Sequence, residues 1–94
     1  MVRKVLVYLH TSSDQHDVLQ YILENIVNRM QIAPGNIKAK IYQSTANQDF
    51  FLLEEDWSSA DTHQEFVDEL EENGLMDQLK EVLSDNMTTE VYDG

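Results

Sequence analysis

Hydrophobic positions change their period several times along the chain, and each change marks an expected element. The run Val2 to His10 is rich in Val, Leu and Tyr, which predicts a strand, and both of its alternate faces are largely apolar. From Val18 to Met30 apolar residues recur at i, i+3 and i+4, the pattern of an amphipathic helix. We expect Ser12 or Ser13 to cap this helix and Pro34-Gly35 to end it, since proline disfavours helix before it and glycine takes the turn.

The middle of the chain predicts a hairpin. Apolar and polar residues alternate from Asn36 to Ser44, which is typical of a strand with one apolar face. Turn-forming residues follow up to Gln48, and a third strand is predicted from Asp49 to Trp57.

The last third predicts two helices and a strand. Ser58 or Ser59 caps a helix that runs to about Asn73, and Gly74 breaks it. A short helix, a turn and a final strand are then predicted over residues 75–83, 84–86 and 87–92.

This β-α-β-β-α-α-β order predicts one ferredoxin-like α+β domain over residues 1–94, with a four-stranded antiparallel sheet. In such a fold the helices cover one sheet face. Phe50 to Leu53 places two large apolar residues on each face, so we expect the second face to be apolar as well. A second copy packed sheet against sheet, as a two-fold homodimer, would cover it. Any space between the sheet and its cover would be a mostly apolar small-molecule pocket.

The amino-acid composition is that of a globular domain and excludes several kinds of site and segment. The 94 residues are 41% hydrophobic and 26% charged, as in a globular domain. The longest apolar run, Val5 to Leu9, is too short for a membrane span or a secretory signal. No cysteine is present, which excludes disulfides, thiolate metal sites and a cysteine nucleophile. The cytoplasm is the expected compartment, and no membrane partner is expected.

Charge is divided unevenly along the chain. Residues 1–47 carry five basic and three acidic side chains, whereas residues 48–94 carry fifteen acids and one lysine. Because binding to phosphate backbones needs clustered Lys and Arg, nucleic acid is not an expected partner. We interpret the acid excess first as solvation of exposed helix faces. A surface suited to high salt and a docking patch for a basic partner are the alternatives.

Two segments carry a resemblance to a known family. Pro34-Gly35-Asn36 follows the first helix, and Phe-Leu-Leu-Glu-Glu-Asp-Trp-Ser-Ser occupies residues 51–59. They resemble the "PG" pair and the Phe, Glu and Trp signature of the antibiotic biosynthesis monooxygenase family of dimeric α/β barrels. The element order and length match over the whole chain. The resemblance implies a homodimer, and several members of the family oxidise phenolic or quinol-type compounds with molecular oxygen and need no metal or flavin.

The candidate site centres on Trp57, which would line the pocket and stack on an aromatic substrate, or else fill the junction of strand and helix. Glu55 is either a general base with a pKa raised by an apolar setting or a strand-end carboxylate bonded to amides. His63 and His10 are suited to moving protons near neutrality, and a helical His such as His63 is alternatively a packing residue. The predicted substrate-binding residues are Tyr8, Tyr42, Phe51, Leu53, Glu55 and Phe66.

Three residues depart from the family's pattern. Leu53 stands where the phenol-oxidising members have Asn, and Phe66 and Val67 stand where the haem-degrading members have a ligating His. A haem-degrading function therefore lacks its axial ligand. The sequence also has no His-Glu-x-x-His helix and no glycine-rich phosphate loop, so no metal site or cofactor is expected. Met30, Met76 and Met87 fit apolar stripes and are interpreted as core gap-fillers.

The leading hypothesis is a cofactor-independent monooxygenase that acts on a small aromatic, phenolic or quinol-like compound. The alternative is a non-catalytic homodimer of the same fold that binds a small molecule or a partner protein. Fold resemblance does not decide between them, because function depends on the chemistry of the site.

Overall fold

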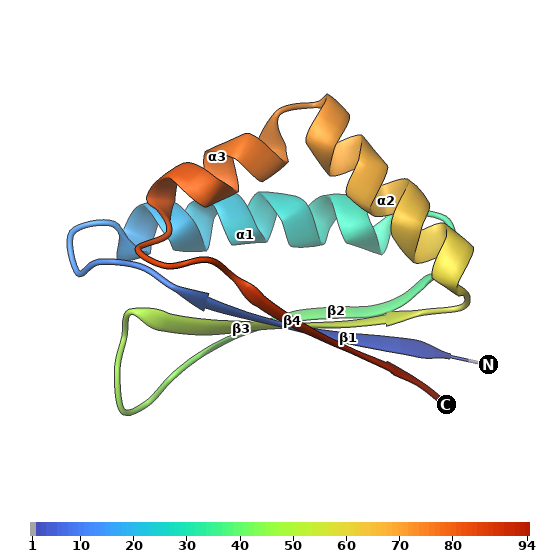
Figure 1. Cartoon of the computed structure of the whole chain (residues 1–94), viewed down its shortest axis with the longest axis horizontal. Coiled ribbons are helices and arrows are strands. Elements are labelled where there is room, and N and C mark those ends of the chain that lie inside the picture. Colours follow the sequence, from blue (N-terminus) through green and yellow to red (C-terminus); the bar gives the residue numbers. More distant parts are fainter. Residues whose placement is uncertain (1) are drawn as a thin grey trace.

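A computed structural model describes residues 2–94 and shows an antiparallel sheet with helices packed on one of its faces (Figure 1). The elements in chain order are β1 Arg3–His10, α1 His16–Gln31, β2 Asn36–Gln43, β3 Phe50–Trp57, α2 Ala60–Glu72, α3 Leu75–Val82 and β4 Thr88–Asp93. The strand order is β2-β3-β1-β4, so the predicted ferredoxin-like α+β fold with a four-stranded antiparallel sheet is confirmed. Among the described residues, no helix has the length and apolar content needed to cross a membrane.

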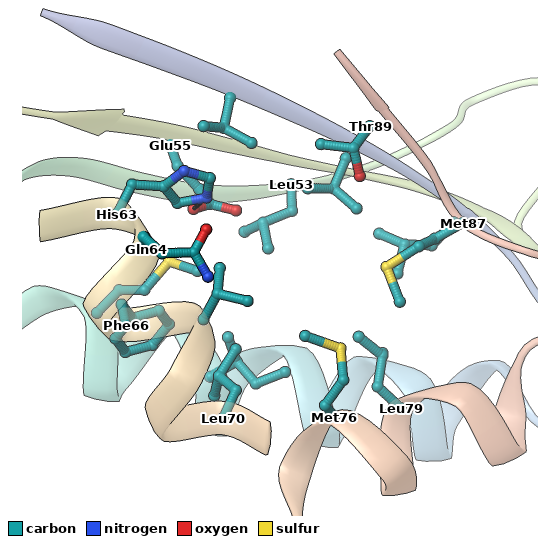
Figure 2. Close-up of a pocket in the computed structure, with 16 residues that line it drawn as sticks. Leu53, Glu55, His63, Gln64, Phe66, Leu70, Met76, Leu79, Met87 and Thr89 are labelled. Atoms are coloured by element: carbon teal, nitrogen blue, oxygen red, sulfur yellow. Dashed lines mark ion pairs between the residues drawn. The ribbon is translucent and has the colours of Figure 1, made fainter. Parts of the chain in front are cut away.

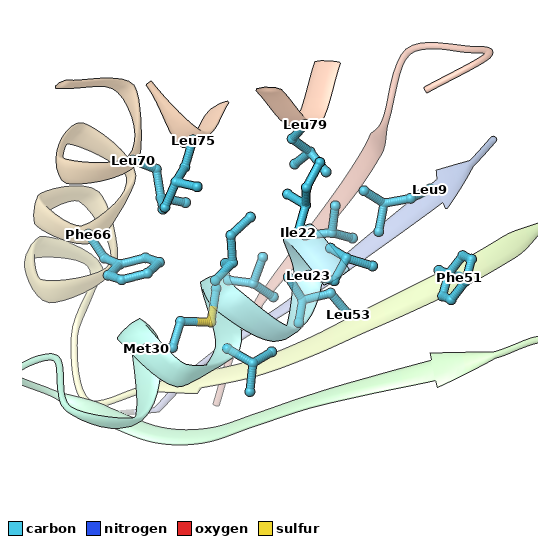
Figure 3. Packing of buried hydrophobic residues seen from close by; sticks show 14 of the residues in the cluster. Leu9, Ile22, Leu23, Met30, Phe51, Leu53, Phe66, Leu70, Leu75 and Leu79 are labelled. Atoms are coloured by element: carbon cyan, nitrogen blue, oxygen red, sulfur yellow. The ribbon is translucent and has the colours of Figure 1, made fainter. Parts of the chain in front are cut away.

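The core lies between the sheet and the helices. Strand β1 pairs with both β3 and β4, and successive side chains alternate between the faces, so Val5, Val7 and Leu9 point toward the helices and are buried. The apolar stripe of α1 packs against them, as Figure 3 shows for Ile22 and Leu23. Each such buried aliphatic side chain contributes roughly 1.5–3 kcal/mol relative to exposure.

The second sheet face carries both apolar and charged side chains, which corrects the prediction of an apolar second face. An apolar band at one end contains Tyr8, Tyr42 and Phe50, which are 42%, 38% and 43% exposed. The other end holds ion pairs: Lys4 Nζ lies 2.8 Å from Glu54 Oε2 and 3.0 Å from Asp56 Oδ1, and Lys38 Nζ lies 3.1 Å from Glu54 Oε1. Paired charges on neighbouring strands satisfy one another across this face.

Helix caps agree with the sequence in one case and not in the other. Ser59 precedes α2 and accepts a hydrogen bond from the Thr62 N–H at 3.2 Å, as predicted. The prediction that Ser12 or Ser13 caps α1 is wrong, because α1 begins at His16 with no side-chain cap. Both serine hydroxyls donate instead to carboxylates, at Asp14 and Asp49.

Two glycines adopt a backbone conformation that L-residues avoid. Gly74 separates α2 from α3 with a φ of 83°, and Gly35 precedes β2 with a φ of 82°. A Cβ at Gly74 would meet open space, whereas a Cβ at Gly35 would lie 2.6 Å from the Thr62 side chain. The Ser58 N–H also donates to the Gly35 carbonyl at 2.8 Å. Gly35 therefore allows β2 to begin directly against the start of α2.

The two glycines provide a matched test of this contact. Gly74→Ala is expected to cost roughly 1–2 kcal/mol of unfolding free energy, the penalty of the left-handed conformation alone. Gly35→Ala is expected to cost a further ~1–3 kcal/mol, because the added methyl group also overlaps Thr62. Urea denaturation of both variants measures the difference, and equal losses would contradict the close approach.

Candidate functional site

A cavity of about 310 Å³ lies between the helix-covered face of the sheet and helices α2 and α3 (Figure 2). This volume is at the lower end of the range of roughly 300–1,000 Å³ that is usual for small-molecule sites. Most of its wall is hydrocarbon or thioether, contributed by Val5, Val7, Leu9, Ile26, Met30, Leu53, Phe66, Val67, Leu70, Met76, Leu79 and Met87. The polar lining residues are Glu55, His63, Gln64 and Thr89.

Glu55 is the buried acid of this cavity. It lies on the inward face of β3, with Val5 and Ala39 opposite it on the neighbouring strands, and only 4% of the residue is exposed. Its Oε1 accepts a hydrogen bond from the Trp57 indole N–H at 2.8 Å. Burial raises the pKa of the Glu55 carboxyl from 4.5 to about 7, although the Trp57 hydrogen bond acts in the opposite direction. Glu55 therefore exchanges its proton near neutrality.

Trp57 joins the end of β3 to the start of α2. Its side chain is fully buried, and its ring centroid lies 5.8 Å from that of His63 and 5.3 Å from that of Phe66. The indole thus fills the junction of strand and helix and also bonds Glu55. These contacts hold α2 against the sheet and fix the place of His63.

His63 is the second titratable group of the cavity. It projects from α2, and its Nε2 lies 4.0 Å from Glu55 Oε1. Burial, and then the positive charge of Arg3, lower the pKa of His63 below its usual 6.5. Arg3 is itself held by two hydrogen bonds to the Asp93 carboxylate, at 2.9 and 3.0 Å. At neutral pH His63 is therefore an uncharged imidazole beside an acid that is close to its own pKa.

This arrangement is suited to moving a proton between Glu55 and a largely apolar ligand. A carboxyl with a pKa near 7 accepts or donates a proton at little cost at that pH. The cavity walls are mostly apolar, and no Lys or Arg lines the cavity among residues 2–94. Within the same residues, no group of three or more His, Cys, Asp or Glu could hold a metal ion.

The structure divides the sequence-predicted residues between two faces. Leu53, Glu55, His63 and Phe66 line the cavity, and Trp57 lies behind Glu55. The other four, Tyr8, Tyr42, His10 and Phe51, do not line it.

Tyr8 and Tyr42 lie on the second sheet face, away from the cavity. His10 ends β1 on that same face, with its Nδ1 2.9 Å from Asp85 Oδ2 and its ring centroid 4.2 Å from that of Phe50. Phe51 points inward but packs in the core and does not line the cavity. These four residues form no common site with Glu55.

Several lining residues were not among the sequence candidates. Gln64 and Val67 come from α2, Met76 from α3, and Met87 and Thr89 from the segment that ends in β4. Met76 and Met87 fit the apolar stripes, so their pattern did not separate cavity wall from core. Met76 and Met87 reach the cavity because α3 and the segment before β4 pack across it from Glu55 in the folded chain.

The stability of a Glu55→Gln variant tests the burial of this acid. Between pH 4.5 and about 7 the folded protein keeps the Glu55 proton that the unfolded chain releases, so the unfolding free energy falls as the pH rises. A neutral amide avoids this loss and still accepts the Trp57 hydrogen bond. We expect little difference near pH 4.5 and a variant more stable by roughly 3 kcal/mol at about pH 8.

Chemical denaturation across this pH range measures the effect. Glu71→Gln, an exposed acid on α2, is the control, and its effect is expected to be small and to change little with pH. A Glu55→Gln difference that does not grow with pH would contradict a raised pKa.

Known proteins share this architecture. The family model described as antibiotic biosynthesis monooxygenase matches residues 2–72. A candidate antibiotic biosynthesis monooxygenase from Nitrosomonas europaea superposes with a TM-score of 0.92 at 16% identity, covering 99% of this chain and 89% of that one. Rv0793 from Mycobacterium tuberculosis gives 0.91 at 16% identity, covering 100% and 95%. The family resemblance predicted from the sequence is thereby confirmed.

A further solved structure is that of a variant of SnoaB, a cofactor-independent oxygenase from Streptomyces nogalater. It superposes with a TM-score of 0.86 at 5% identity, covering 99% of this chain and 92% of that one. At these identities the solved structures show a common fold. No curated protein sequence matches the chain significantly.

Proposed function

Because the chain belongs to the antibiotic biosynthesis monooxygenase family, we propose that it is a cofactor-independent oxygenase of a small phenolic or quinol-like compound. The observation that carries this proposal is the Glu55 and His63 pair at one end of an apolar cavity. The fold shared with SnoaB, a cofactor-independent oxygenase, supports it.

In the proposed reaction, Glu55 accepts the proton of a ring hydroxyl, with neutral His63 beside it as a further proton acceptor. The resulting phenolate is electron-rich and reacts with molecular oxygen in a cavity that excludes water. One oxygen atom replaces the hydrogen on a ring carbon and forms a carbonyl. The other leaves as water, with the hydroxyl proton and the displaced hydrogen. The phenol thus becomes a quinone, and the substrate supplies all the electrons.

We also propose that the protein forms a homodimer through the second sheet face. The distribution of charge favours this face as the dimer interface over the helical surfaces. The strands carry four of the six basic side chains and five of the eighteen acids, whereas the rest of the chain has thirteen acids against Arg29 and Lys80. Helical surfaces of two copies would repel each other, while the sheet face is nearly balanced and has an apolar band. The exposed aromatic side chains of this band are typical interface material.

One observation favours the non-catalytic alternative. Leu53 contributes a hydrocarbon side chain to the cavity wall, at the position where the sequence resemblance implies an Asn in phenol-oxidising members. A cavity without that amide still binds an aromatic compound. Binding without turnover would identify this alternative.

Oxygen uptake tests the oxygenase. With a panel of quinols and polyphenols, the wild-type protein is expected to consume oxygen above the uncatalysed rate. Glu55→Gln is expected to lower the rate by roughly 100-fold or more, because it removes the proton acceptor. Glu71→Gln, far from the polar end of the cavity, should keep the wild-type rate. No turnover above background with any compound would end the enzymatic proposal and leave the binding module.

Analytical sedimentation tests the dimer. Leu52 lies half-buried on the second sheet face, opposite Tyr8 and Tyr42 on the neighbouring strands. Leu52→Lys is expected to convert a dimer into a folded monomer, since the lysine would be buried unpaired at the interface. Val18→Lys, on the exposed side of α1, should remain a dimer. A wild-type protein that is monomeric at micromolar concentration would contradict the proposal, and circular dichroism checks that both variants fold.

A further inference from the structure

Among the described residues, the cavity lining has one ionisable acid, Glu55, and one ionisable base, His63, which is uncharged at neutral pH, so no cation of the lining balances an added negative charge. Glu55 and His63 lie together at one end, and Met76, Leu79 and Met87 line the other end (Figure 2). Gln64 donates its amide to Asp68 at 3.0 Å. A ligand in the cavity therefore meets polar groups mainly at Glu55 and His63, and at Thr89.

The two oxygens of Glu55 are not equivalent. The Trp57 indole donates to Oε1, and His63 approaches the same oxygen. None of the hydrogen bonds among residues 2–94 engages Oε2, although Glu55 lines the cavity. Trp57 thus leaves one carboxyl oxygen free to accept a hydrogen bond from a ligand. A ligand that covers this oxygen without donating a hydrogen bond to it would leave it unpaired, at a cost of about 1–3 kcal/mol, so a ligand that brings a donor is favoured.

Negative charge on a ligand has no partner in this environment. Among the described residues, the lining contains no Lys or Arg, His63 is uncharged at neutral pH, and Glu55 is the one lining side chain that becomes negative. The outer face of α2 adds further acids, at Asp61, Glu65, Asp68, Glu69, Glu71 and Glu72. Above about pH 7, where Glu55 is mostly ionised, an anion would be repelled on approach and then buried unpaired beside a carboxylate, which is strongly unfavourable.

We propose that Glu55 is a specificity-determining residue that admits ring compounds presenting a hydrogen-bond donor and excludes those carrying a carboxylate, sulfate or phosphate. The inference rests on the proposed use of this cavity as the substrate site. It narrows the substrate to an uncharged hydroxylated ring system with no acidic substituent. The same ring skeleton with an acidic group added is not a substrate.

Three ligands with one skeleton test the two parts of this selectivity. Naphthol has the donor, methoxynaphthalene lacks it, and naphthoate carries a negative charge. Binding is measured without oxygen at about pH 8, where Glu55 is mostly ionised, by calorimetry and by fluorescence of Trp57, the single tryptophan. The wild-type protein is expected to bind naphthol at least about tenfold more tightly than either of the other two.

The Glu55→Gln variant separates specificity from general affinity. Replacing the carboxyl by a neutral amide is expected to reduce the preference for naphthol over naphthoate by about tenfold or more, because the repulsion is removed. Glu71→Gln retains the long-range acidity of α2 almost fully and should keep the wild-type ratio. An unchanged ratio in Glu55→Gln, or wild-type binding of naphthoate as tight as that of naphthol, would overturn the proposal.

The outcome is distinguishable from that of the oxygenase test. Selective binding without oxygen uptake upholds the role of Glu55 and rejects the oxygenase. Oxygen uptake with equal binding of naphthol and naphthoate does the reverse. Absence of binding by all three ligands shows that the cavity does not hold aromatic rings, and this inference is then wrong.

Discussion

The hydrogen bond between the Trp57 indole and the Glu55 carboxyl is the interaction on which the site depends. It lies at the junction where β3 ends and α2 begins, and both residues are buried. A carboxyl in such a place would be costly if it were ionised and unpaired. The structure reduces this cost in two ways, because the indole satisfies one oxygen and burial keeps the proton bound up to about pH 7. The proton transfer proposed for the cavity depends on these two features of Glu55.

The two faces of the sheet differ in burial and in the side chains that they carry. The inward face builds a thin core, as expected for a chain of this length, and leaves a cavity where α2 and α3 diverge from the strands. The second face combines an apolar band with paired charges around Glu54. A face of that kind favours association without the strong insolubility of a uniformly apolar sheet. In the proposed homodimer, the acidic helices would keep the contact on the sheet side, because like charges repel.

Much of the fold could be predicted because it depends on local patterns. Alternation in β1 and β3, the glycine at position 74 and the cap at Ser59 each act over a few residues. The prediction for the start of α1 failed because the Ser12 and Ser13 hydroxyls found carboxylates nearby, and one of these, Asp49, is distant in sequence.

The site could be predicted only in part, for a geometric reason. Alternation shows that Tyr8 and Glu55 belong to opposite sets of strand positions, yet it does not reveal which set faces a cavity. Tyr42 and His10 are predicted site residues together with Glu55, but they share the strand face of Tyr8, and the structure places that face away from the cavity. Met87, from the last third of the chain, reaches the cavity only through the path of α3 and β4.

One irregularity in the alternation of β3 nevertheless points to the candidate site. Every inward position of β3 except one carries a large apolar or aromatic side chain, namely Phe51, Leu53 and Trp57. Glu55 breaks the alternation in the middle of the hydrophobic face, and a domain with a thin core gains no stability from a buried acid without a cation. Residues that conflict with the local rules of folding are expected at functional sites. The bond from Trp57, the neighbouring His63 and the cavity beside them all lie at that conflict, which is why a chemical role explains Glu55 better than a structural one.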